Sequence, residues 1–226
     1  MNINQIAIFH GPLKEKFGIP RQSGLAGSLE GSVELCGEYA REEALRGLEG
    51  FDRIWLIWGF SANSHGGWSP TVRPPRLGGN KTVGVFASRS PFRPNPLGLS
   101  CVKLERIEGT RLFVRGADLM DGTPIYDIKP YVPYADAFPE AAGGFTDSVG
   151  WETLKVVLPE NDVLSEDEAQ ALRQILAQDP RPQYQDDPKR EYGMDYGRFN
   201  VRFRVEGNIL TVTEILPEQH SGKVAD

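Results

Sequence analysis

Apolar residues occur in short runs along the first part of the chain, and glycine, proline, asparagine or aspartate separates one run from the next. Six runs are rich in β-branched and aromatic residues: 5–9, 54–60, 83–87, 99–107, 111–116 and 152–158. Runs of this length and composition, bounded by turn residues, are typical of β-strands. The pattern therefore predicts a mainly β fold, a barrel or a sandwich, for residues 1–158.

The run at residues 54–58, Ile-Trp-Leu-Ile-Trp, has no polar alternation. Such a strand is expected to be covered on both faces, so we place it at the centre of the core. A helix is predicted around residues 41–48, where apolar residues recur at helical spacing, and it would cover one face. We interpret Trp55 and Trp58 as core residues rather than as ligand contacts.

The tail has a different pattern. Ser165 and Glu168 form a capping-box sequence, and apolar residues follow at helical spacing, which predicts a helix over residues 166–178. Residues 199–205 and 209–215 each alternate strictly around a Glu-Gly-Asn turn, which predicts a β-hairpin. We therefore expect a second, small α+β domain over residues 159–226.

Charge separates the two parts in the same way. The 226-residue chain has a formal net charge of −6, and residues 159–226 hold 8 basic and 14 acidic side chains. No general basic coat is present, so binding of an anion has to rely on local clusters. The two cysteines, Cys36 and Cys101, are too few for a disulfide framework, which favours a reducing compartment, by default the cytoplasm. Neither an export signal nor a membrane span of about 18 apolar residues is apparent.

One local cluster is strongly basic. Residues 71–100 contain five basic side chains and no acidic one. Prolines flank Arg93 and one follows Arg73, so stiff backbone is expected to hold these arginines. Stiffly held guanidinium groups suit phosphate or carboxylate ligands, although a merely rigid, soluble loop is the simpler alternative.

Negative observations exclude several kinds of site. The chain lacks Gly-x-Gly-x-x-Gly, a Gly-Lys-Ser/Thr phosphate loop, His-Glu-x-x-His and Gly-x-Ser-x-Gly. The three histidines are not at metal-ligand spacing, so no metal is expected. What remains includes an Asp-Gly-Thr-Pro turn at residues 121–124, whose backbone amides and hydroxyl are suited to a small polar ligand.

Four segments together resemble one known family: residues 20–25 (Pro-Arg-Gln-Ser-Gly-Leu), 66–80, 84–98 and 121–131. In this order they are similar to the TsaA-like tRNA methyltransferases, over about residues 9–134, and the tail resembles the extra C-terminal domain of bacterial members. The resemblance implies a small β-barrel that binds S-adenosyl-L-methionine and works as a homodimer. It further implies methylation of N6 of threonylcarbamoyladenosine at position 37, in the anticodon loop of threonine tRNA.

By resemblance, eleven residues would contact the cofactor: Ser23, Gly24, Leu25, Ser61, Ala62, Arg89, Leu99, Asp121, Gly122, Thr123 and Pro124. Ser61-Ala62 departs from the more polar His-Gln pair of some relatives, so backbone contacts are what carries over there. The reaction is a displacement at a sulfonium methyl, and the protein's task is mainly alignment and electrostatics. Asp127 or Tyr126 could accept the proton of the attacked nitrogen, and no sequence feature selects one of them.

The tRNA contact requires cations and hydrogen-bond donors placed for phosphates. The candidates are Lys14, Lys16, Arg21, Arg73, Arg76, Arg93, Asn95 and Lys129. Because bases of a single-stranded anticodon loop can stack on rings, Phe92, Tyr126 and Trp68 are candidate platforms. Two alternatives stay open at this point: a non-catalytic RNA-binding barrel and a methyltransferase acting on a small anionic metabolite.

Overall fold

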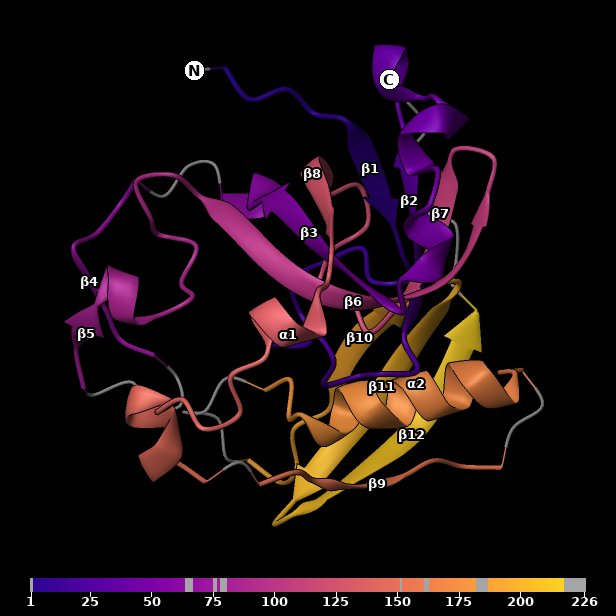
Figure 1. The fold of residues 1–226 in the computed structure, drawn as a ribbon. Coiled ribbons are helices and arrows are strands. Elements are labelled where there is room, and N and C mark those ends of the chain that lie inside the picture. The colour runs from indigo at the N-terminus through magenta and orange to yellow at the C-terminus, as the bar shows by residue number, and fades with distance from the viewer. Residues whose placement is uncertain are drawn as a thin grey trace, which may run out of the picture.

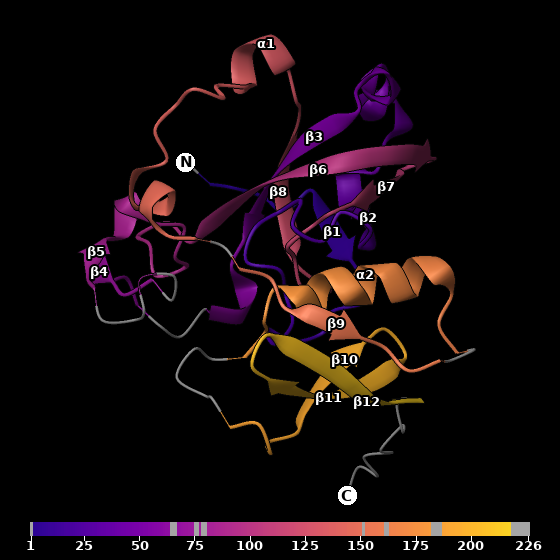
Figure 2. The same ribbon diagram turned by 90° about the horizontal axis from the view of Figure 1, so that it is seen from below.

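The computed structural model describes residues 2–63, 67–74, 77, 81–150, 152–160, 163–181 and 187–217. It is mainly β, with a closed barrel followed by a four-stranded sheet that carries one helix (Figure 1). The mainly β fold with a small α+β C-terminal part is thus confirmed. A short arm projects from the barrel, in both Figure 1 and Figure 2.

The barrel has the strand order β1-β2-β7-β6-β3-β8, and β8 closes it by pairing with β1. Its strands are β1 (Ala7–His10), β2 (Glu30–Leu35), β3 (Arg53–Gly59), β6 (Leu97–Glu108), β7 (Arg111–Arg115) and β8 (Pro124–Pro130). Every barrel pairing is antiparallel. Buried aliphatic and aromatic side chains of all six strands fill the interior as one cluster.

Strand β3 differs from the expectation that both its faces are buried. Ile54, Leu56 and Trp58 point into the barrel, whereas Trp55 and Ile57 are only half-buried on the outside. The predicted helix at residues 41–48 is wrong as well: the segment forms two short 3₁₀ turns, Glu42–Leu45 and Leu48–Gly50. The outer face of β3 is instead contacted from the short helix α1 (Pro133–Asp136), since the Trp55 indole donates to Asp136 at 3.0 Å.

The arm consists of β4 (Thr71–Val72) paired with β5 (Val83–Gly84), followed by a 3₁₀ turn at Val85–Ala87. Other 3₁₀ turns lie at Gly37–Tyr39, Ser61–Asn63 and Gly144–Ser148. Residues 88–96 connect the arm to β6, which is the longest barrel strand.

The C-terminal sheet has the order β10-β11-β12-β9: β10 (Tyr192–Tyr196), β11 (Phe199–Glu206), β12 (Ile209–Pro217) and β9 (Lys155–Val157). Helix α2 (Glu166–Ala177) lies between this sheet and the barrel strands in Figure 2. Its capping box is present, because Ser165 accepts from the Glu168 amide and Glu168 accepts from the Ser165 amide. Helix and hairpin are therefore confirmed. Strand β9 precedes the division predicted at residue 158 and pairs with β12.

Candidate functional site

A pocket of about 190 Å³ opens where β3 ends, and three parts of the chain line it. The lining residues are Lys16 and Ile19 before β2, Trp58, Gly59, Phe60, Ser61 and Ala62 at the end of β3, and Asp118, Met120 and Thr123 before β8. Gly59 allows the Tyr126 ring to approach the end of the strand, because a Cβ at that position would lie 2.8 Å from the ring. The pocket therefore depends on segments that are far apart in the sequence.

Asp118 is held at this pocket by a chain of hydrogen bonds. The Trp58 indole Nε1 donates to the Ser100 hydroxyl at 2.8 Å, and that hydroxyl donates to Oδ1 of Asp118. Burial raises the pKa of Asp118, while the Ser100 hydrogen bond, a Ser23 backbone hydrogen bond and the charge of Arg89 oppose the rise. A carboxylate with little water around it interacts more strongly with a nearby charge than one in bulk water does. The pocket thus offers a fixed, partly buried acid.

The loop that contributes Lys16 and Ile19, residues 11–29, is seated on the C-terminal domain. Its Leu13, Ala26 and Leu29 belong to the same buried cluster as α2 and β10–β12. The Phe17 ring stacks on Phe203, with 6.3 Å between centroids and 10° between planes. One hydrophobic core therefore contains both the loop and the C-terminal domain.

Backbone contacts fix the same loop at two further places. The Gly197 amide donates to the Pro12 carbonyl at 2.7 Å, and the Ser28 amide donates to the Gln174 side chain at 2.8 Å. Gly18 has a φ of +94°, and a Cβ there would lie 2.1 Å from Sδ of Met194. The loop approaches the C-terminal sheet so closely that only glycine fits at this position.

Comparison with known proteins identifies the family. Residues 8–137 match the family model described as the tRNA-methyltransferase O N-terminal domain, and residues 155–218 match the TrmO C-terminal domain. The chain belongs to the tRNA-methyltransferase O (TrmO) family. The resemblance drawn from the four motifs is thereby confirmed.

Individual TrmO relatives align over most of this chain. A tRNA (adenine(37)-N6)-methyltransferase of Escherichia coli K12 is 41% identical over 215 residues, covering 89% of this chain and 92% of that protein. A protein of the same description from Eikenella corrodens is 48% identical over 177 residues, covering 74% and 97%. The crystal structure of TrmO from Pseudomonas aeruginosa superposes with a TM-score of 0.78 at 33% identity, covering 95% and 97%.

The predicted cofactor residues fall into three groups in this TrmO chain. Ser61, Ala62 and Thr123 line the pocket. Ser23 and Arg89 act on its Asp118, as described above, and the Arg89 guanidinium also donates to the Gln22 side chain. The other predicted residues, Gly24, Leu25, Leu99, Asp121, Gly122 and Pro124, are not among the lining residues. Their role as cofactor contacts stays a prediction.

The turn at residues 121–124 uses its polar groups differently from the sequence-based argument. The amides of Asp121 and Gly122 donate to the carbonyls of Leu13 and Phe9, at 2.7 and 2.9 Å. The Thr123 hydroxyl donates to the Met120 carbonyl at 2.7 Å. These donors are therefore satisfied within the chain, and the turn ties the loop at residues 11–29 to the barrel.

The two candidate proton acceptors have different surroundings. The Tyr126 ring packs against Gly59, a lining residue of the pocket. Asp127 forms an ion pair with Lys129, 2.8 Å between Oδ2 and Nζ, and accepts from the Ile128 amide. Asp127 and Lys129, predicted for different roles, thus contact each other, whereas Tyr126 lies beside the pocket.

The predicted tRNA-binding residues are distributed over two regions. Lys14, Lys16 and Arg21 lie on the loop at residues 11–29, and the first two are exposed. Arg73, Arg93 and Asn95 lie on or after the arm, and Arg76 falls outside the described residues. The Arg93 guanidinium donates to the carbonyls of Val85 and Ser88, at 3.1 and 2.7 Å, so it holds the arm's 3₁₀ turn.

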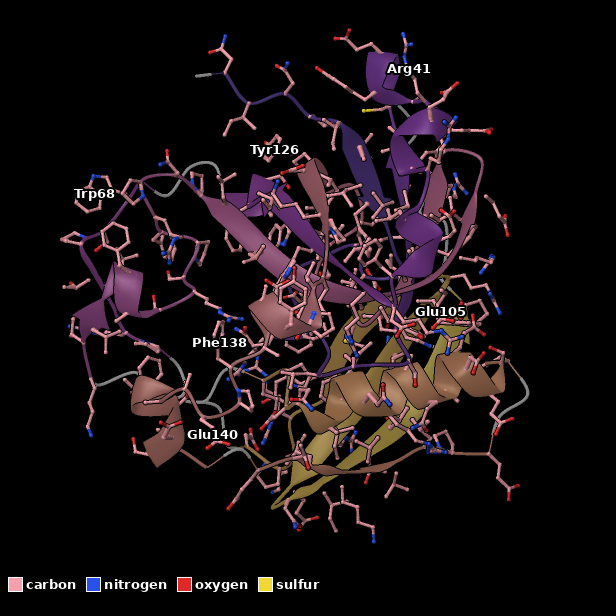
Figure 3. All side chains as sticks on the ribbon, viewed as in Figure 1. Arg41, Trp68, Glu105, Tyr126, Phe138 and Glu140 are labelled. Carbon is pink, nitrogen blue, oxygen red and sulfur yellow. The ribbon has the colours of Figure 1, made fainter. Side chains whose placement is uncertain are left out.

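Two of the three candidate stacking residues, Trp68 and Tyr126, are separated in space. Trp68 lies just before β4 of the arm and Tyr126 on β8 of the barrel, well apart in Figure 3. Trp68 and Phe92 are 58% and 43% exposed, so their rings are accessible for stacking. The structure does not bring Trp68 and Tyr126 into a single platform.

Three arginines of the C-terminal domain are paired with acidic neighbours. Arg202 and Arg204 on β11 lie 3.7 and 3.3 Å from Glu191, and Arg202 is also 3.9 Å from Glu214. Arg198 is paired with Glu168 at 3.2 Å. These arginines therefore do not form a free cationic face for a phosphate backbone.

Sequence reasoning missed Asp118 and Ser100 as site residues and read Trp58 as core alone. Trp58 is indeed buried, yet it also lines the pocket. One signal was present in the sequence: Asp118 is the single charge in the apolar stretch Ala117-Asp118-Leu119-Met120. Within the described ranges, no grouping of three or more His, Cys, Asp or Glu could hold a metal ion, and no helix is long and apolar enough to cross a membrane.

Proposed function

We propose that this chain transfers a methyl group from S-adenosyl-L-methionine to N6 of threonylcarbamoyladenosine at position 37 of threonine tRNA. Relatives aligned over most of the chain are described as tRNA (adenine(37)-N6)-methyltransferases, and both family domains are matched. The observation that carries the proposal is the pocket, because segments bearing three of the family motifs meet at or beside it. We further propose the cytoplasm as its compartment, because two free cysteines fit a reducing environment.

The chemistry of the pocket fits this cofactor. S-adenosyl-L-methionine supplies an electrophilic methyl group on a positively charged sulfur that is bonded to three carbons. A cation of this kind is suited to a carboxylate beside aromatic and aliphatic side chains, as Asp118 lies beside Trp58 and Phe60. We assign the holding of the cofactor to the pocket residues together with Ser23 and Arg89.

The residues of this chain then have to align the nitrogen of the substrate and take up its proton. Tyr126 and Asp127 are the proposed acceptors. Tyr126 has the more favourable position, since its ring packs against Gly59 of the pocket. Asp127 would first have to leave its ion pair with Lys129.

Cations on the loop before β2 and on the arm support the tRNA part of the proposal. Lys14, Lys16 and Arg21 come from the loop before β2, and Arg73 comes from the arm. Phosphates of an anticodon loop would be contacted from these two regions. Arg93 donates hydrogen bonds to two backbone carbonyls of the arm, so it would act by holding the arm in place.

A homodimer is part of the proposal. The pocket volume of about 190 Å³ lies below the roughly 300–1,000 Å³ usual for small-molecule sites, which is consistent with a site that a second chain enlarges. Leu99, a predicted cofactor residue, is 55% exposed on β6 and absent from the lining of its own pocket. Both observations are accounted for if a second copy completes each pocket.

One assay tests the proposed function against its alternatives. The purified chain is incubated with labelled S-adenosyl-L-methionine and threonine tRNA that carries threonylcarbamoyladenosine, and the RNA is digested to nucleosides. Label in the N6-methylated nucleoside supports the proposal. Cofactor binding without transfer to tRNA would favour a small anionic substrate, and tRNA binding without cofactor binding would favour an RNA-binding protein without catalytic activity.

A further inference from the structure

Asp118 has an unusual position among the residues of the pocket. Among the described lining residues it carries the one carboxylate, and Lys16 is the only other charged side chain. The remaining lining is largely apolar, and the Trp58 and Phe60 rings pack edge to face with 4.4 Å between centroids. A charge in such surroundings has little water to solvate it. A bound cation would therefore be stabilised by Asp118 more than by an exposed acid.

The hydrogen bonds of Asp118 restrict the kind of cation it can serve. Its Oδ1 already accepts from the Ser100 hydroxyl, and backbone hydrogen bonds from Asp118 itself and from Ser23 use further acceptor capacity. An ammonium group has three N–H donors and needs several free acceptors. A sulfonium has no hydrogen to donate, so it requires only a nearby negative charge and polarisable or aromatic surfaces. The geometry favours the sulfonium.

We propose that Asp118 is the counter-ion of the sulfonium of S-adenosyl-L-methionine, and that it makes this TrmO chain prefer the methyl donor to the demethylated product. This inference rests on the proposed function for its choice of cofactor. Ser100 is a positioning residue that holds the carboxylate, and Trp58 holds Ser100 in turn.

The consequence for turnover follows from the charge change in the reaction. The methyl carbon–sulfur bond breaks with its electron pair remaining on sulfur, a carbon–nitrogen bond forms, and the nitrogen loses a proton. Sulfur is therefore positive before transfer and neutral after it. An interaction with the positively charged sulfur strengthens binding of S-adenosyl-L-methionine and is lost in the demethylated product. It therefore promotes release of that product without raising the rate of the chemical step.

Protonation of Asp118 should weaken donor binding alone. Burial raises the pKa of Asp118, and a bound cation would lower it again. The other charged groups that bear on this site are Arg89, which favours the ionised form, and Lys16 in the lining. As pH falls through the raised pKa, affinity for S-adenosyl-L-methionine should decrease. Affinity for S-adenosylhomocysteine, which keeps the ammonium and lacks the sulfonium, should not follow.

Titration calorimetry with both ligands tests the proposal on the full chain. In Asp118→Asn, affinity for S-adenosyl-L-methionine should fall at least about tenfold, or about 1.4 kcal/mol. Affinity for S-adenosylhomocysteine should change less than about twofold. The amide oxygen of asparagine can still accept from Ser100, so the fold should persist, which a melting curve checks. Asp195→Asn is the control, because Asp195 accepts from Asn200 on the C-terminal sheet, away from the pocket lining.

Equal loss for both ligands would overturn the proposal, because Asp118 would then contact a part that both ligands share. No loss for either ligand, or no binding to the unmodified chain, would also overturn it. If Asp118→Asn does not fold, Ser100→Ala is used instead. Loss of the Ser100 hydroxyl, which favours the ionised carboxylate, should move the pH midpoint of S-adenosyl-L-methionine binding upward. An unchanged midpoint would contradict the proposal. If donor selectivity depends on Asp118 but no methyl group reaches tRNA, the proposed function fails and this inference stands.

Discussion

Replacing Phe17 with alanine separates the loop at residues 11–29 from part of its support on the C-terminal domain. Phe17 is half-buried and stacks on Phe203, which is fully buried. Complete burial of such a side chain stabilises by about 1.5–3 kcal/mol, and an aromatic pair adds about 0.5–1.5 kcal/mol. For a half-buried ring we therefore expect Phe17→Ala to cost about 1–2 kcal/mol.

This free energy bears on function because Phe17 lies between Lys16 and Ile19, both of which line the pocket. If the whole loss appears as disorder of the loop, binding of cofactor and tRNA weakens by about five- to thirtyfold. Leu13, Ala26 and Leu29 remain anchored, so the measured loss should lie at or below this range. Calorimetry gives cofactor affinity and filter binding gives tRNA affinity, with the free energy of unfolding from urea titration.

The matched control is Ile107→Ala. Ile107 is a partly buried residue that packs against the barrel core from β6. Ile107→Ala should lose a similar free energy of unfolding, while the affinities for cofactor and tRNA stay within about twofold. Phe17→Leu should restore most of the affinity that Phe17→Ala loses. If Phe17→Ala loses stability as expected but binds both ligands normally, the C-terminal domain does not position this loop for binding.

Three further changes have defined expected outcomes. Arg93→Ala should release the arm, because it removes the two hydrogen bonds that one guanidinium nitrogen donates to the carbonyls of Val85 and Ser88. It should weaken tRNA binding and leave cofactor affinity nearly unchanged, and equal loss of both affinities would contradict this. If Tyr126 accepts the proton, Tyr126→Phe should lower the rate of methyl transfer at least about tenfold in single-turnover assays, while Asp127→Asn changes it little. The reverse result would assign the role to Asp127. Ser165→Ala removes the helix cap and should cost about 1 kcal/mol in urea unfolding, whereas no measurable change would mean that tertiary contacts alone hold the start of α2.

Local features of the fold were predictable from the sequence. Helix α2 begins at Glu166, where Ser165 and Glu168 form the capping box, and its signal is complete within a few residues. The hairpin of β11 and β12 is likewise fixed by alternation around one short turn. The segment at residues 41–48 had helical spacing too, but tertiary context left it as two 3₁₀ turns.

The pocket was less accessible to prediction because it is made by long-range pairing. Ser100 is on β6 and Asp118 follows β7, so their hydrogen bond requires the register of the barrel. The motif at residues 121–124 contributes Thr123 to the lining of the pocket, whereas its amides at Asp121 and Gly122 bind the carbonyls of Leu13 and Phe9. Residue types in the sequence therefore indicated the region of the pocket. The strand pairing that closes the barrel determines which side chains face the pocket.

The loop at residues 11–29 packs on a domain that is synthesised much later than the loop itself, and this delays its folding. Residues 11–29 leave the ribosome early, yet the core that receives Leu13, Ala26 and Leu29 is made by residues from Leu164 onward, up to Val212 on β12. At about 5–20 residues per second, the loop waits some tens of seconds for its partner surface. A nascent or prematurely terminated chain would therefore close its barrel without a settled binding loop. Incomplete copies would then be poor competitors for tRNA.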